Sequence, residues 1–98
     1  MTYAQTFAEH VRLCILRSLS EAGNSTNSSI LTDIVNGFGL PASRDAIETH
    51  LAWLEEQGFV RLERPVPSIT VAKLTKRGLD VAEGRARVPG VKNRGPED

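Results

Sequence analysis

The chain has 98 residues, of which 40 % are apolar and 24 % are charged, and these values fit one globular domain and exclude wholesale disorder. Twelve basic residues balance twelve acidic ones, and this neutrality argues against a protein that coats nucleic acid by charge alone. One cysteine excludes an internal disulfide, no apolar run approaches the roughly 18 residues of a membrane span, and no secretory signal is recognised, so we expect a reduced, cytoplasmic protein with no membrane contact.

The first part of the chain predicts two helices separated by a polar loop. The apolar side chains of residues 3–21 recur at three- and four-residue steps on two faces of one helix. This pattern predicts a helix that is either surrounded by other parts of its own chain or shared with another subunit. Gly23 and the polar run at residues 24–29 then predict a loop. A short second helix is expected at residues 29–36, with a serine or asparagine as its N-cap.

The third predicted helix spans about residues 43–57. Ser43 is a suitable N-cap because its hydroxyl can accept a hydrogen bond from a free amide of the first turn. Gly58 follows the last turn, where a left-handed residue commonly ends a helix. The apolar positions that we expect to face the core are Ile47, Leu51 and Leu54.

The next part of the chain predicts a β-hairpin and a last helix. Residues 60–63 alternate apolar and charged side chains, which is typical of a half-buried strand. Residues 64–68 contain two prolines and are predicted to form the hairpin tip, with residues 69–74 as the return strand. The last helix is expected at about residues 76–87 and is interrupted early by Gly78.

Three helices followed by a hairpin and another helix form the winged helix-turn-helix plan, a mainly α fold with a small β-hairpin. We expect this domain at residues 1–88 and a flexible basic tail at residues 89–98. Residues 51–78 run from an apolar helix end through Gly58 and the hairpin to Leu-Thr-Lys-Arg-Gly, and in this order they resemble ArsR, MarR and PadR-type winged-helix regulators. Residues 12–19 are similar to the first core helix of ArsR-like proteins.

The chain resembles more closely the small winged-helix proteins encoded in Mu-like prophages. This resemblance spans nearly the whole chain, and it implies the fold and a phage-type protein rather than a particular biochemical role. The segments that carry it are residues 15–19, 27–31, 43–45, 50–58, 79–85 and 88–92.

Charge is divided unevenly between the two halves of the chain. Residues 1–59 carry three basic and seven acidic residues, whereas residues 60–98 carry nine basic and five acidic ones, and such an asymmetry can mark an anion-facing end.

In winged-helix proteins the third helix enters the DNA major groove and the wing contacts the backbone. We therefore expect a non-enzymatic protein that binds double-stranded DNA as a transcriptional regulator, through the wing, the start of the last helix and the tail. The expected nucleic-acid-binding residues are Ser43, Arg44, Thr49, Arg61, Arg64, Lys73, Lys76, Arg77, Lys92 and Arg94.

The third helix also supports a different function. Its outward face carries the carboxylates of Asp45, Glu48, Glu55 and Glu56 without a cation, so it is a poor recognition helix. Trp53 lies between the outward and the core-facing sides of this helix and is a candidate partner-binding residue, although a lone tryptophan more commonly packs beside a small core. The alternative is a protein–protein interaction module that does not bind DNA. Its phage or host partner would dock on Asp45, Glu48, Trp53 and Glu56.

No catalytic, metal or cofactor site is expected. The chain has no grouping of nucleophile, base and acid and no phosphate-binding glycine loop, which argues against an enzyme. His10 and Cys14 stand four residues apart on the first helix, but two ligands are not a metal site, and a packed helix face is the expected role. A homodimer is expected through the first and last helices.

Overall fold

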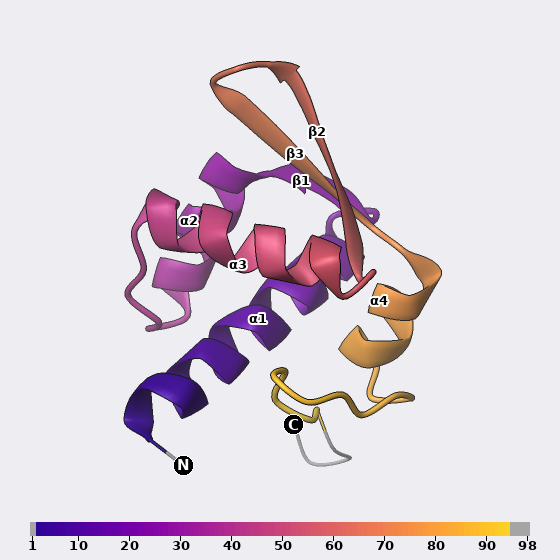
Figure 1. Ribbon diagram of the computed structural model, residues 1–98. Coiled ribbons are helices and arrows are strands. Elements are labelled where there is room, and N and C mark those ends of the chain that lie inside the picture. The colour runs from indigo at the N-terminus through magenta and orange to yellow at the C-terminus, as the bar shows by residue number, and fades with distance from the viewer. Residues whose placement is uncertain (1, 95–98) are drawn as a thin grey trace.

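The structure is a computed structural model of the chain and describes residues 2–94. Helices cover one side of a small antiparallel sheet, and a long hairpin projects away from them (Figure 1). The fold of the described residues is α+β. The elements in chain order are α1 (Tyr3–Glu21), β1 (Ser25–Asn27), α2 (Ser28–Gly37), α3 (Arg44–Glu56), β2 (Val60–Val66), β3 (Ile69–Leu74) and α4 (Lys76–Ala82).

Side-chain caps determine where the helices begin. The Ser43 hydroxyl accepts a hydrogen bond of 3.0 Å from the amide of Ala46, which confirms it as the N-cap of α3. Asn27 caps α2 and Thr75 caps α4 in the same way. Gly58, with a φ of 83°, stands directly after the C-cap of α3 in the left-handed conformation that its place in the sequence predicted.

The sheet has the strand order β1-β3-β2, and one of its strands was not predicted. Residues 24–29 were expected to form a loop, but residues 25–27 pair antiparallel with β3, so that expectation was wrong for β1. The predicted hairpin tip was too long, because β2 continues through Pro65 to Val66 with an irregular register after Glu63. Proline is tolerated there because β2 lies at the edge of the sheet, where a residue without a backbone N–H need not remove a hydrogen bond to a neighbouring strand.

The core lies where α1 crosses the other elements. This helix contacts α2, α3, α4 and β3, and its Leu13 and Leu16 are buried along with Val11 and Ile15, which explains the two apolar faces of its sequence. The predicted core stripe of α3 is confirmed, since Ile47, Leu51 and Leu54 are completely buried. Tyr3 differs from its apolar neighbours on α1 because it is 81 % exposed.

The last helix is shorter than predicted and contains Gly78 in its interior. A Cβ atom at Gly78 would overlap the carbonyl oxygen of Phe59, so only glycine allows α4 to approach this segment so closely. The helix ends at Ala82 rather than near residue 87. Its end is fixed where the amides of Arg85 and Ala86 both donate to the Asp80 carbonyl, at 2.8 and 3.2 Å.

The segment after α4 packs against the helices instead of forming a free tail. Val91 is only 6 % exposed, and the amide of Lys92 donates to the Glu9 carbonyl of α1 at 3.2 Å. The expectation of a flexible tail therefore does not hold for residues 89–94, because an apolar side chain anchors them in the core. The rest of the expected tail, residues 95–98, lies outside the described residues. Within residues 2–94, no helix combines the length and apolar character needed to cross a membrane.

Candidate nucleic-acid interface

The hairpin formed by β2 and β3 is attached to α3 at both ends of that helix. At the start of α3, the Arg44 guanidinium donates from Nη2 to the carbonyl of Ser68 at the hairpin tip, at 2.7 Å. Near the end of α3, Oε2 of Glu55 accepts a hydrogen bond of 2.9 Å from the amide of Leu62. These two contacts link the hairpin, whose ribbon projects away from the helices (Figure 1), to both ends of α3.

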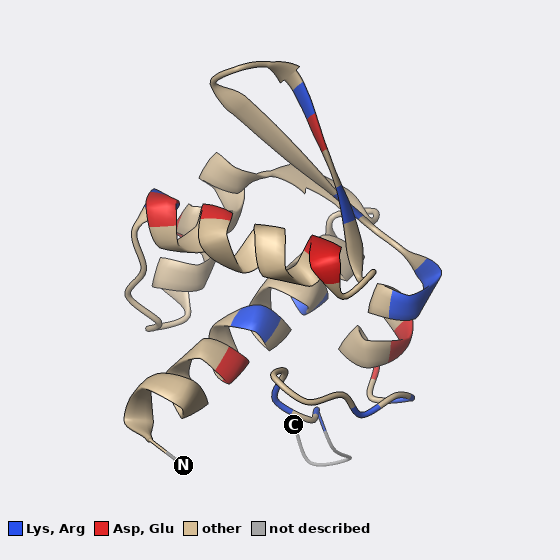
Figure 2. Ribbon diagram, viewed as in Figure 1, with Lys and Arg blue, Asp and Glu red and all other residues tan. Residues whose placement is uncertain are grey.

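Most of the predicted cations lie along the hairpin and at the start of α4 (Figure 2). Arg61 lies directly across the ladder from Lys73, and both are exposed, as is Arg64 further along β2. Within residues 2–94, neither Arg61 nor Arg64 forms an ion pair. Lys73 and Lys76 are partly neutralised, because their Nζ atoms lie 3.2 Å from Glu63 and 3.7 Å from Asp80. Arg77 lies with its guanidinium carbon 5.1 Å from the centre of the Phe59 ring.

The three predicted contact residues at the start of α3 have partners within the chain. The Ser43 hydroxyl acts as the N-cap, and the Thr49 hydroxyl donates to the Asp45 carbonyl at 3.1 Å. Arg44 holds the hairpin tip, and its Nε atom also lies 3.9 Å from the carboxylate of Glu48. Arg44 and Thr49 remain exposed, so both still belong to the surface.

The carboxylates of α3 do not form the uniform acidic face that the sequence predicted. Glu48 is partly buried, and its Oε2 atom accepts a hydrogen bond of 2.6 Å from the Ser28 hydroxyl, which ties α3 to α2. Glu55 bonds the backbone of β2. Asp45 and Glu56 are the two that stay exposed without such a contact in the described chain. Each of these carboxylates keeps its negative charge, and among the described residues only Glu48 has a cation close by, with Nε of Arg44 at 3.9 Å.

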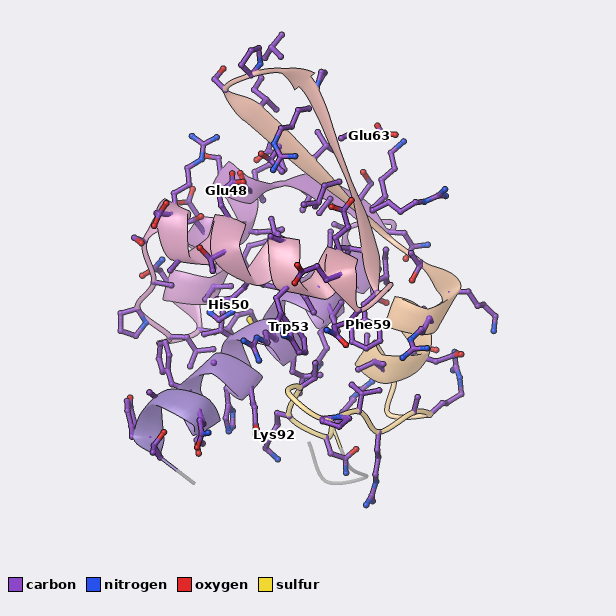
Figure 3. All side chains as sticks on the ribbon, viewed as in Figure 1. Glu48, His50, Trp53, Phe59, Glu63 and Lys92 are labelled. Carbon is purple, nitrogen blue, oxygen red and sulfur yellow. The ribbon has the colours of Figure 1, made fainter. Side chains whose placement is uncertain are left out.

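Trp53 is covered by other parts of the chain and does not form an open binding patch. The Arg12 guanidinium carbon lies 4.0 Å from the centre of its ring, and the centre of the Phe59 ring lies 6.4 Å from it. A side chain at Gly90 would collide with the ring, so the C-terminal segment also packs on it. Trp53 thus packs where three separate segments meet and is partly buried, which agrees with the commoner role of a tryptophan beside a small core (Figure 3).

Arg12 organises this cluster, a role that was not predicted from the sequence. Its Nε atom donates to Nδ1 of His50 at 3.2 Å, and its Nη1 atom donates to the Gly90 carbonyl at 2.9 Å. Burial, and secondarily the charge of Arg12, lowers the pKa of His50 below its ordinary value. No local pattern could have identified Arg12, because its three partners are distant in the sequence and only the fold brings them together.

Lys92 and Arg94 are not brought to the hairpin. The C-terminal segment lies at the opposite end of the molecule from the hairpin tip (Figure 1). The Lys92 ammonium donates to the neighbouring carbonyl of Asn93 at 3.3 Å. These two predicted tail contacts therefore lie on a different part of the molecule from the hairpin cations.

The described residues contain no group of three or more histidine, cysteine or acidic side chains placed to hold a metal ion. His10 and Cys14 are both partly buried on α1. Burial raises the pKa of the Cys14 thiol, which favours its protonated form over the thiolate that binds metals.

Two known proteins are similar to this chain over most of its length, whereas no model of a known protein family and no solved structure matches it. The chain is 48 % identical over 88 residues to the protein gp26 of Escherichia phage Mu, which covers 90 % of this chain and 91 % of the phage protein. It is 39 % identical over 98 residues to a protein of Haemophilus influenzae, which covers 95 % of this chain and 96 % of that protein. Both relatives are described as uncharacterized. The chain belongs to the family of small proteins that includes gp26 of phage Mu.

Proposed function

We propose that this protein is a winged helix-turn-helix protein that binds duplex DNA and catalyses no reaction. The observation that carries the proposal is the attachment of the hairpin to both ends of α3, which combines the helix with an exposed row of cations. In this proposal α2 and α3 are the helix-turn-helix pair, and the β2–β3 hairpin is the wing. The element order and the antiparallel hairpin support that assignment.

Arg61 and Arg64 supply the main phosphate contacts in this proposal. Both are exposed and without an ion pair among residues 2–94, so each can meet a phosphate without first leaving a carboxylate. Lys73 and Lys76 add contacts by exchanging their exposed carboxylate partners, which costs little because exposed ion pairs are weak. The hairpin therefore positions the protein on the duplex, and Arg44 and Thr49 contribute the few contacts to bases.

The relationship to a phage Mu protein supports a phage-type role for this DNA binding. A small protein that attaches to duplex DNA without catalysis suits the regulation of transcription in the host cytoplasm. This role follows from the proposed binding and depends on it.

The test compares two arginine variants of the purified full chain for binding to a labelled duplex by fluorescence anisotropy. In the first variant, Arg61→Gln is combined with Arg64→Gln. We expect its affinity at low salt to fall by about tenfold or more and the log–log salt slope to fall by about 2, because two phosphate contacts are lost. The control is Arg87→Gln, which removes an exposed charge after α4. Equal affinity of the double variant and the wild type would contradict the proposal.

A protein–protein interaction module is the second candidate function. Two observations favour it, namely the exposed carboxylates of Asp45 and Glu56 and an apolar hairpin tip, where Val66 is 45 % and Ile69 is 42 % exposed. Glu48 and Trp53 no longer belong to this docking surface, because both have partners within the chain. The double variant Asp45→Lys, Glu56→Lys separates the two functions. If the protein binds DNA, this variant should bind it more tightly than the wild type does. If the protein is an interaction module, neither the variant nor the wild type binds DNA.

A further inference from the structure

One face of α1 carries a regular stripe of side chains that the rest of the chain leaves at least partly uncovered, although Phe7 and Cys14 also touch the edge of the core. Along the helix the spacing alternates between four and three residues, which is the repeat of helices that pair with one another. Every member of the stripe is exposed or only partly buried. The stripe consists of Tyr3, Phe7, His10, Cys14, Arg17 and Glu21.

The N-terminal end of this stripe is an aromatic projection. Tyr3 is 81 % exposed and stacks on Phe7, with ring centres 6.0 Å apart. In Figure 1 the first turns of α1 extend beyond the other helices of the domain. A large aromatic side chain in such a position leaves apolar surface in water, which a partner could cover.

The other end of the same stripe is hollowed. A groove of about 410 Å³ lies between the second half of α1 and the connection from α2 to α3. Phe38, in that connection, is 68 % exposed. The residues that line the groove include Leu13, Cys14, Arg17, Glu21, Phe38 and Leu40.

We propose that two copies of the chain associate through this face, with their α1 helices antiparallel and related by a two-fold axis near the level of residue 12. The aromatic projection of each copy then enters the groove of the other, so that one type of contact forms twice, as a two-fold interface requires. A second copy fits better than an unrelated partner because the projection and the hollow lie at opposite ends of one stripe.

The charges of the stripe are complementary in this arrangement. Phe7 lies opposite Arg17 of the second copy, so that a guanidinium meets an aromatic ring. Tyr3 lies opposite Glu21 of the second copy, where its hydroxyl can donate to a carboxylate. Of the two helices that the sequence predicted at the dimer surface, the proposed interface uses α1 and not α4. The helix α4 is short and buries Val81 and Ala82 against its own chain.

Sedimentation velocity over about 5–200 µM tests this inference without reference to DNA. We expect the wild type to form a dimer and the double variant Tyr3→Lys, Phe38→Lys to associate at least tenfold more weakly. Both substituted side chains are highly exposed, so the fold should persist. The matched control is Ile30→Lys, which charges another exposed apolar position, on α2, and should leave the dimer intact. A wild type that stays monomeric at 200 µM would overturn the inference, as would a control that dissociates like the double variant.

The location of the interface has its own readout. Amide NMR spectra recorded on dilution should change along α1 and at residues 38–40, where the proposed contacts lie. Changes confined to α4 or to the hairpin would contradict this interface even if the protein is a dimer.

Discussion

Gly78 shows how the absence of one side chain sets the position of a helix. The Thr75 hydroxyl donates to the Phe59 carbonyl at 3.0 Å and accepts from the Gly78 amide at 3.0 Å. A Cβ atom at Gly78 would overlap the same carbonyl oxygen and lie 2.8 Å from Cδ1 of Leu74. The start of α4 therefore packs directly on the backbone that follows α3, and backbone cannot move aside as a flexible side chain can.

The substitution Gly78→Ala should lower the free energy of unfolding by about 2–3 kcal/mol, because the added methyl group forces α4 away from Phe59. The matched control is Gly37→Ala at the last residue of α2, where no atom beyond its chain neighbours and its own helix backbone lies within 4 Å of the new Cβ. That change should be neutral or stabilising by up to about 1 kcal/mol. Urea denaturation of both variants measures the two effects, and similar values for the two would show that the close approach is not what Gly78 serves.

At the scale of elements, the cluster around Trp53 holds the C-terminal segment on the domain. Arg12 bonds both His50 of α3 and the Gly90 carbonyl, and it stacks on the Trp53 ring. A hydrogen bond of this kind contributes about 1 kcal/mol to stability, and the cation–aromatic contact contributes a similar amount. Protonation of His50 at Nδ1 would remove the acceptor for Arg12 and place two cations side by side.

This cluster predicts a pH dependence of stability. The pKa of His50 in the folded chain lies below its unfolded value of about 6.5, so the unfolded chain takes up the proton first. Stability should therefore fall as the pH drops below about 6.5 and stop falling, for this group, below the folded pKa. In His50→Gln the amide oxygen can still accept from Arg12 but does not titrate. Urea denaturation at pH 7.5 and 5.0 should show a smaller loss for the variant, and parallel losses would refute the assignment to His50.

The elements that the sequence predicts well are those with local signals. Ser43 and Gly58 mark the ends of α3 through bonds and dihedral angles that involve only nearby residues. β1 has no such signal, because its three polar residues become a strand only by pairing with β3, more than forty residues later. Val91 was likewise placed in a tail, since a proline and a glycine beside it indicate a turn while its burial depends on the whole domain.

At the scale of the whole molecule, the cations and carboxylates of the candidate interface were predictable, but their pairing was not. The alternation along β2 identified Arg61 as an exposed charge, and the structure agrees. The roles of Glu48 and Glu55 depend on Ser28 and Leu62, which only the fold brings near α3. Lys92 and Arg94 were grouped with the hairpin by charge alone, whereas the chain carries them to the other end of the molecule.

We propose that the surface of the hairpin and α3 binds the phosphates of duplex DNA. The most direct test is fluorescence anisotropy of the purified wild-type chain against a labelled random duplex at about 50 and about 200 mM salt. We predict binding at the lower salt that weakens by about two orders of magnitude or more at the higher salt, as expected for roughly five phosphate contacts. Absence of binding at tens of micromolar protein in about 50 mM salt would contradict the claim and favour a protein partner for this surface.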